Sequence, residues 1–426
     1  MYQDIIVNEK IKNVLIAVLA GDASGYVFEG MKKAHIKSVF KKREAFPDPE
    51  PALKKNMNKW KKPGLYSSLT QFMILNGASI EKKQWNREKF IQMLGDSPEL
   101  PGLDYSFFRS PDAAGRNLIS MAKNPQLKKD TLFSFPCSNV VPSALPLLYF
   151  SENSENLLFP IISYSMLFTT DPGTIASSIA MSLLIKDLIN SDKNTGIHKA
   201  SAHSLAKTES FTKEHENIIF RSGINPDYVT GRISLIRKIL DKTVNIEKLD
   251  DCEKIICKET EEELQTRIAR ATTNLPETLF PYAVSIAERC NNPADVFITA
   301  AYEGGASSAL SSMTGAIASA CCNNIIPDEL LSGIINRKKI SAIISCISSE
   351  KERKTIYNEM IQSEPPLTLK ELEEYNSKNK KNPDNKNKNK PKTRRDAEAE
   401  ISKHIVESWT KIDKAKWKKE RNKHKV

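Results

Sequence analysis

A run of small residues at positions 302–322 has the composition of a helix whose N-terminal end could form a ligand site. It reads YEGGASSALSSMTGAIASACC and begins with the paired glycines Gly304 and Gly305. Glycine lets a backbone approach its neighbours closely, and we favour this packing role over phosphate binding because a glycine pair alone is a weak signal. A divalent metal at this end of the helix would need carboxylates, and none directly follows the glycines.

Two carboxylates lie in an earlier segment, VLAGDASGYVFE at positions 18–29. Asp22 directly follows an apolar stripe formed by Ile11, Val14, Leu15, Val18 and Leu19. This spacing predicts a helix that stops at Gly21, because glycine commonly follows the last helical turn. Asp22 is then either an acceptor for backbone donors in the turn or a ligand contact. Glu29 is either a surface acid or a ligand contact.

Other catalytic arrangements find little support in the sequence. His198, His203 and His215 share a polar stretch with three glutamates, Glu209, Glu214 and Glu216, and could bind a transition metal. Their spacing does not match an HExxH helix face, so we favour surface or core histidines. The chain has no GxSxG elbow, Walker loop or kinase motif set. Cys257 and Cys290 have no histidine nearby in the sequence.

The elements that carry these residues are predicted to be helical. Apolar residues recur at helical spacing, whereas period-two runs bounded by turns are few, so we predict an all-α fold. Thr169 or Asp171 is the expected N-cap before Pro172. Predicted helices beyond the first cover 116–122, 175–189, 233–239, 264–271, 294–301, 309–320 and 330–335.

The charge distribution divides the chain into a neutral body and a basic tail. Residues 376–426 hold 18 Lys and Arg against 7 Asp and Glu, so the whole formal excess of +11 lies there. The tail begins with a low-complexity Lys/Asn run that cannot bury enough apolar surface to offset its ordering entropy. We predict a main domain over 1–364, a disordered linker over 365–395 and a basic amphipathic helix or tail over 396–426.

The tail offers two kinds of contact. Ile401, Ile405, Trp409 and Ile412 recur at helical spacing and predict a short amphipathic helix. The surrounding lysines could contact a polyanion or an acidic protein, although a solvated tail is the simpler interpretation. The string KNKNKPKTRR has the composition of a nuclear localisation patch. We therefore expect an intracellular protein, cytoplasmic or directed to the nucleus.

Further sequence features agree with a globular protein in a reducing compartment. The seven cysteines are scattered, odd in number and without CxxC pairs, which argues against disulfides and structural zinc. The first ten residues lack the cationic and apolar regions of a secretory signal. The most apolar stretch, 157–168, is far shorter than the roughly 20 residues of a spanning helix, so we expect no membrane span.

Five segments together resemble the ADP-ribosylglycohydrolase family, whose members are all-helical hydrolases that remove ADP-ribose from proteins or related acceptors. The first segment matches the family's opening GDAxGxxxE at Gly21, Asp22, Ala23, Gly25 and Glu29. In chain order, the five segments are VLAGDASGYVFE (18–29), YSSLTQFMIL (66–75), CSNVVPSALPLL (137–148), LFTTDPGTIASSIAMSLLI (167–185) and YEGGASSALSSMTGAIASACCNNIIPDELL (302–331). The resemblance implies a compact orthogonal bundle of helices, here with a basic C-terminal extension.

The acidic positions of the family are mostly replaced. The family's Thr-Asp-Asp-Thr-Gln run corresponds here to residues 67–71, SSLTQ, and its Gly-Gly-Asp-x-Asp-Thr run corresponds to residues 304–309, GGASSA. All four aspartates are lost, and of the matching metal-binding positions only Glu29 is still acidic. Two neighbouring Mg²⁺ ions need several carboxylates as hard oxygen ligands. We therefore expect no metal and no cofactor, with the two-magnesium site of the family lost.

The matching positions define a candidate site. Glu29 would be the catalytic residue if the chain is active. The ligand-binding candidates that the resemblance implies are Asp22, Glu29, Ser68, Thr70, Gln71, Asn139, Thr170, Gly304, Gly305, Ser307 and Ser308. The segment YSFFRSPDAAGR (105–116) is a candidate lip, because its aromatic residues could stack on adenine and its arginines could meet a diphosphate. Core aromatics and surface arginines explain this segment equally well.

Three hypotheses about function follow. The first, which we favour, is an inactive pseudoenzyme that keeps a cleft for ADP-ribose, a related nucleotide or a protein partner. The second is an active ADP-ribosyl hydrolase with an altered or metal-free site. The third is a structural or interaction protein whose cleft is closed, as in the jellyfish lens crystallins that resemble this family.

Overall fold

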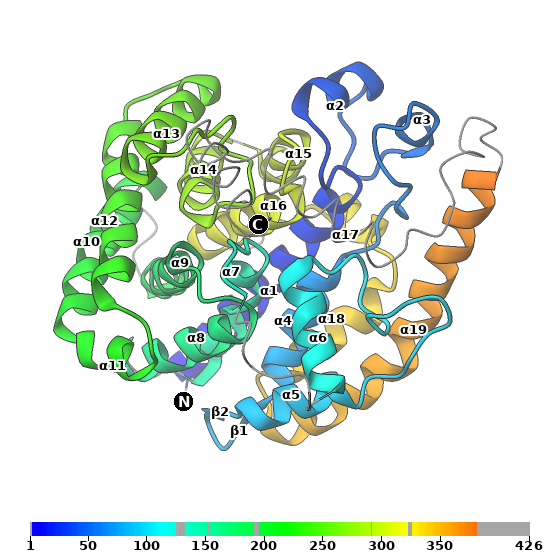
Figure 1. Ribbon diagram of the computed structural model, residues 1–426, viewed down its shortest axis with the longest axis horizontal. Helices are drawn as coiled ribbons and strands as arrows, with labels where there is room; N and C mark the ends of the chain where they lie inside the picture. Colours follow the sequence, from blue (N-terminus) through cyan, green and yellow to red (C-terminus); the bar gives the residue numbers. More distant parts are fainter. Residues whose placement is uncertain are drawn as a thin grey trace, which may run out of the picture.

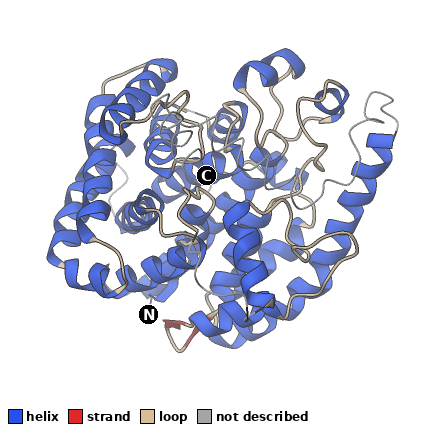
Figure 2. Ribbon diagram, viewed as in Figure 1, coloured by secondary structure: helices blue, strands red, loops and turns tan. Residues whose placement is uncertain are grey.

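The computed structural model describes residues 2–124, 126, 133–150, 154–190, 196–290, 292–322 and 326–380. Helices make up almost all of the regular structure in these residues, which confirms the predicted all-α fold (Figure 2). The described strands form one short hairpin, with β1 (Ile80–Glu81) antiparallel to β2 (Gln84–Trp85) and Ile80 opposite Trp85.

The described helices follow one another along the whole domain, joined by loops and one 3₁₀ turn. They are α1 (Tyr2–Tyr26), α2 (Lys33–Val39), α3 (Glu50–Lys54), α4 (Ser68–Ala78), α5 (Arg87–Gly95), α6 (Ala113–Lys123), α7 (Val140–Ser143), η1 (Leu145–Phe150), α8 (Ser154–Phe168), α9 (Pro172–Asn190), α10 (Ile197–Glu214), α11 (Glu216–Arg221), α12 (Pro226–Thr243), α13 (Leu249–Leu264), α14 (Pro276–Arg289), α15 (Pro293–Tyr302), α16 (Ser307–Cys321), α17 (Asp328–Gly333), α18 (Arg337–Cys346) and α19 (Glu350–Lys380).

The helices surround a central pair, α1 and α16. Helices α10 to α13 lie on one side of this pair, and α19 runs along the opposite side, where it packs on α4 (Figure 1). One large cluster of buried apolar side chains extends through the bundle from α1 to α19. The segments that carry the candidate site residues therefore meet at the centre of the fold.

Helix α1 does not stop at Gly21 as predicted, because Gly21 and Gly25 are the points where α16 crosses it. A Cβ at Gly21 would lie 2.3 Å from the Ser311 carbonyl oxygen, and one at Gly25 would lie 2.3 Å from the Ser307 carbonyl oxygen. Two serines of α16 also donate to α1: Ser307 Oγ to the Gly25 carbonyl at 2.7 Å and Ser312 Oγ to the Val18 carbonyl at 3.0 Å. The small residues of α16 thus serve close helix packing.

Replacing Gly21 by alanine should destabilise the protein, because the two backbones must separate to admit the methyl group. Overpacking of this kind typically costs about 1–3 kcal/mol. Gly231 in α12 is the matched control, since a Cβ there meets nothing within 4 Å. Gly231→Ala should be neutral or stabilise by up to about 1 kcal/mol. Urea unfolding of the three proteins measures both changes, and equal stability of the two variants would contradict the tight crossing.

Two further helix predictions have opposite outcomes. The N-cap before Pro172 is confirmed, because Asp171 Oδ2 accepts a hydrogen bond from Thr174 N at 2.7 Å. The predicted helix over 264–271 is wrong, since α13 ends at Leu264 and Gln265 adopts the left-handed conformation with φ 51°. The apolar spacing was accidental there, because this C-cap turns the chain out of the helix.

The predicted boundary at Pro365 also differs from the structure. Helix α19 continues through Pro365 and Pro366 to Lys380, although a proline inside a helix costs about 3 kcal/mol. Glu364, Thr368 and Glu371 lie on its buried face. Their long-range partners hold the helix in place, and no local signal in the Pro-Pro and Lys/Asn composition revealed them. The linker predicted from 365 thus belongs to the domain as far as residue 380.

The rest of the predicted linker and the basic amphipathic tail, residues 381–426, lie outside the described residues. Among those described, α9 is long and apolar enough to cross a membrane, but 83% of its apolar window is buried inside the fold. Burial to this extent is typical of the core helix of a globular fold.

Candidate functional site

Asp22 lies inside α1 and holds the N-terminus of α4 against it. Its Oδ2 atom accepts hydrogen bonds from Ser67 N at 2.9 Å, Thr70 N at 3.1 Å and Thr70 Oγ1 at 2.7 Å. Burial raises the pKa of the Asp22 carboxyl, and these hydrogen bonds oppose the shift. Asp22 thus accepts from donors at the start of a neighbouring helix, and not from a turn after its own helix as the structural alternative expected. Its ligand role stays a prediction.

Glu29 has the corresponding position at α16. Its Oε2 atom accepts from Ser308 N at 2.8 Å and Ser307 Oγ at 3.3 Å, in the first turn of the helix. A carboxylate is favourable at this end of a helix because of the exposed N–H groups and the dipole. Burial raises the pKa of Glu29, and the nearby ammonium of Lys61 opposes the shift. Glu29 is half-buried, so one side of it still faces a cavity.

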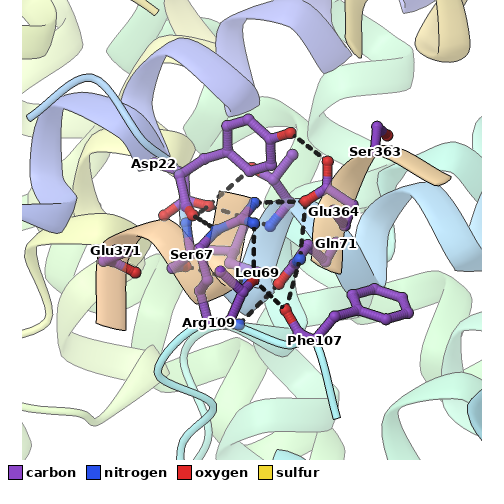
Figure 3. A network of polar contacts seen from close by, with 12 residues as sticks. Asp22, Ser67, Leu69, Gln71, Phe107, Arg109, Ser363, Glu364 and Glu371 are labelled. Carbon is purple, nitrogen blue, oxygen red and sulfur yellow. Dashed lines mark hydrogen bonds and ion pairs between the residues drawn. The ribbon is translucent and has the colours of Figure 1, made fainter. Parts of the chain in front are cut away.

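The segment 67–71 is buried and bonded to the loop before α6. Ser68 N donates to the Arg109 carbonyl at 2.8 Å, and Gln71 Oε1 accepts from Arg109 N at 2.9 Å. Gln71 Nε2 donates to the Phe107 carbonyl at 3.2 Å (Figure 3). Ser68, Thr70 and Gln71 are at most 1% exposed, so the polar groups of this segment are used inside the protein.

Gly304 and Gly305 also make close backbone contacts within the protein. Gly304 and Gly305 have φ values of 71° and 64°, which favour glycine. Gly30 N donates to the Gly305 carbonyl, and Gly305 N donates to the Met31 carbonyl, each at 2.8 Å. A Cβ at Gly305 would lie 2.0 Å from the Thr272 carbonyl oxygen. These contacts confirm the packing role favoured for the pair.

The family of this chain follows from its match to a protein-family model. The model described as ADP-ribosylglycohydrolase matches residues 3–358, which is most of the chain. This chain belongs to the ADP-ribosylglycohydrolase family. A solved structure named "ADP-ribosylglycohydrolase-related protein complex" is similar at 12% identity and a TM-score of 0.49, covering 81% of this chain and 98% of its own. No curated protein matches the chain.

The central residues do not fit the two-magnesium centre that the ADP-ribosylglycohydrolase family implies. Within the described ranges, no group of three or more His, Cys, Asp or Glu side chains is placed to hold a metal ion. Asp22 Oδ1 and Ser308 Oγ are buried without a hydrogen-bond partner among the described residues, but Leu69 and Ala306 supply no ligand beside them. Two divalent cations need several carboxylates to balance their repulsion.

A buried ion pair connects Arg109, in the loop before α6, to Glu364 of α19. Arg109 Nη2 lies 2.6 Å from Glu364 Oε2, and both side chains are fully buried. Glu364 also accepts from Tyr66 Oη at 2.7 Å and Gln71 Nε2 at 2.9 Å (Figure 3). Arg109 Nε donates to the Tyr66 carbonyl at 2.7 Å, and the guanidinium lies 4.5 Å from the Tyr66 ring centroid. The sequence identified Arg109 as a lip residue but gave no sign of Glu364, which follows the end of the family match.

A cavity near these residues lies between α19 and the predicted lip. We call it the Trp60 pocket; it measures about 410 Å³ and has three walls, formed by residues 58–61, residues 103–116 and the stretch of α19 from Thr368 to Tyr375. Tyr105, Phe108, Arg109 and Arg116 all line it. Phe108 and Arg109 are also buried, as the alternative of core aromatics expects for Phe108, and ligand contact by this segment stays a prediction. Glu29 is the one member of the predicted ligand set that lines this pocket.

Asn139 and Thr170 lie elsewhere, near the first turns of α6, α7 and α9. Asn139 Nδ2 donates to Asp112 Oδ2 at 3.3 Å, and Thr170 N donates to the Phe133 carbonyl at 2.8 Å. Asp112 caps α6 through Gly115 N and also accepts from Cys137 Sγ at 2.9 Å. The structure therefore does not bring Asn139 and Thr170 into the Trp60 pocket, and their ligand role stays a prediction.

His198, His203 and His215, which the structure describes, are not part of any described group of side chains that could hold a metal ion. His198 is buried, with Nε2 3.2 Å from Thr243 Oγ1, and burial lowers its pKa to about 4. The Nδ1 atom of His215 lies 2.9 Å from the Phe211 carbonyl oxygen. His198 is thus a core residue, in line with the interpretation favoured over metal binding.

Proposed function

We propose that this member of the ADP-ribosylglycohydrolase family has lost two-metal hydrolysis and serves as a non-catalytic binding protein. The observation that carries the proposal is that Asp22 and Glu29, the two carboxylates of the segment 18–29, both bind the first turn of a neighbouring helix. Asp22 Oδ2 is bonded at the start of α4, and Glu29 Oε2 is bonded at the start of α16. In the same segments, the positions that carry aspartate in the family are Ser68, Leu69, Ala306 and Ser308.

The binding role is supported by the Trp60 pocket. Its volume of about 410 Å³ lies within the range of small-molecule sites, and Glu29 lies at its edge. ADP-ribose or a related nucleotide is the first candidate ligand, because the chain shares the family's fold. Hydrolysis by Glu29 without metal is less favoured, since its Oε2 atom is already bonded to Ser308 N.

We expect no release of ADP-ribose from ADP-ribosylated protein, with or without Mg²⁺. The reason is that too few carboxylates remain to hold the ions that would activate a water. Wild-type protein and Glu29→Ala should both match the protein-free reaction in a product-release assay. Mg²⁺-dependent release that disappears in Glu29→Ala would overturn the proposal.

Calorimetric titration with ADP-ribose separates the binding role from a closed structural protein. Heat of binding without turnover supports the module proposed here. If ADP-ribose neither binds nor reacts, the interpretation as a structural protein with a closed cleft gains support instead.

A further inference from the structure

A local excess of basic side chains lies in residues 32–62. This segment holds 11 Lys and Arg against 3 Asp and Glu, a difference of +8. Residues 1–375 are neutral in total, so acidic residues elsewhere in the domain balance this excess. The segment therefore creates a positive local field that the net charge of the domain does not reveal.

The fold gathers this segment into one unit at the surface. The unit contains α2 and α3, which lie next to each other at the edge of the molecule (Figure 1). Ile36, Phe40 and Ala52 are buried in one small apolar cluster, and Met57 packs against it. Because the apolar side chains of the unit face this cluster, its charged side chains are left to the outer surface.

Some basic residues of the unit pair with carboxylates and so help to hold it on the domain. Lys33 Nζ lies 2.6 Å from Glu303 Oε2, and Lys62 forms an ion pair with Glu374 of α19. Lys33 is half-buried, and burial of its partner Glu303 makes this pair part of the protein interior. These lysines have a structural role.

Five further lysines have no such role, and we call them the lysine face. All five are exposed and make no ion pair with the described residues: Lys32, Lys37, Lys41, Lys42 and Lys55. Like charges gathered without partners repel one another and disfavour the compact state. Folding therefore does not explain the lysine face, whereas a partner of opposite charge would.

The apolar side chains of the unit argue against a lipid surface as that partner. Peripheral membrane binding needs apolar side chains that enter the headgroup region in addition to basic charge. No large apolar side chain of residues 32–62 is exposed. The helices α2 and α3 are also short, with 7 and 5 residues. Binding through this unit must therefore depend on charge.

The type of the basic residues favours phosphate groups over the carboxylates of an acidic protein. Carboxylates are bound most specifically by the bidentate guanidinium of arginine, whereas lysine acts as a flexible point charge. The lysine face contains lysine alone. A nucleic-acid duplex presents one phosphate charge per about 1.7 Å of its axis, which flexible point charges neutralise without a fixed geometry.

We propose that the lysine face binds the sugar-phosphate backbone of a double-stranded nucleic acid without reading its sequence. The proposal goes beyond the binding role of the Trp60 pocket and does not depend on it, because none of the five lysines lines that pocket. A failure to bind ADP-ribose would leave it unaffected.

Fluorescence anisotropy with a short labelled DNA duplex tests the proposal in the full chain, where the basic tail is the same in every variant. The triple variant Lys37→Gln, Lys41→Gln and Lys42→Gln removes three charges of the lysine face. Each lost phosphate contact lowers the slope of log K against log salt by about 1, so the triple variant should lower it by about 3. An RNA duplex of the same sequence shows which of the two duplexes fits better.

A matched triple variant removes the same number of charges from exposed lysines elsewhere. It combines Lys199→Gln and Lys207→Gln in α10 with Lys351→Gln in α19. The control should leave the affinity and the salt slope unchanged. Equal losses in the two triple variants, or no loss in either, would contradict the lysine face as the binding surface.

Acetylation of the wild-type protein keeps the test decisive if a variant does not fold. Saturating duplex should protect Lys41 and Lys42 from acetylation, whereas Lys199 and Lys207 should stay reactive. Vesicles of anionic phospholipid and polyglutamate are compared with the duplex at equal charge. Tighter binding of either one, with the same protection of Lys41 and Lys42, would assign the surface to another class of partner and overturn the proposal.

Discussion

Arg109→Met should lower the free energy of unfolding by about 3–5 kcal/mol, because it leaves the carboxylate of Glu364 buried without its ionic partner. Arg109 and Glu364 are both fully buried and lie 2.6 Å apart. The loss should appear as a lower midpoint in urea unfolding, with the slope of the transition unchanged.

A double-mutant cycle separates the ion pair from the general packing of α19. Replacing both residues, as in Arg109→Met with Glu364→Leu, should cost clearly less than the sum of the two single changes, since no uncompensated charge remains. Arg116→Met is the control in the neighbouring helix α6, because Arg116 is exposed. Additive single changes would show that the pair does not link α19 to the domain.

Glu277→Gln should stabilise the protein at neutral and alkaline pH by an amount on the order of 3 kcal/mol, but not at pH 4. Glu277 is 2% exposed, and its Oε2 atom has no hydrogen-bond partner among the described residues. Burial raises the pKa of its carboxyl from 4.5 to about 7, and Asp171 adds to the shift. Arg232, whose Nε lies 3.7 Å from Glu277 Oε1, opposes the shift only in part.

The sign of this effect follows from proton binding. Because the folded protein holds the proton more tightly than the unfolded chain, the stability that protonated Glu277 contributes is complete below pH 4.5 and is lost as the pH rises through 7. The difference in unfolding free energy between Glu277→Gln and wild type should therefore increase over this range. Glu373→Gln, at an exposed position in α19, measures the effect of an amide alone. A difference independent of pH would contradict the raised pKa.

Local patterns in the sequence were sufficient to predict the fold class and the family. Helical periodicity along 1–364 predicted the all-α architecture, and the ordered segments beginning with Gly21, Asp22 and Gly25 predicted a family that the match over 3–358 confirms. The replacement of four aspartates can likewise be read from the sequence, because the residue type alone decides whether a side chain offers a carboxylate to a metal ion. These properties are carried by neighbouring residues, so one sequence reveals them.

The tertiary structure decided how the remaining polar residues are used. Gly21 was predicted to end a helix, and its true role depends on α16, almost 300 positions later in the chain. Pro365 was predicted to begin a linker, yet the helix continues because Glu364 pairs with Arg109, 255 positions earlier. The walls of the Trp60 pocket also meet only after folding. Contacts between residues so far apart leave no periodic or compositional trace, and only the folded chain brings them together.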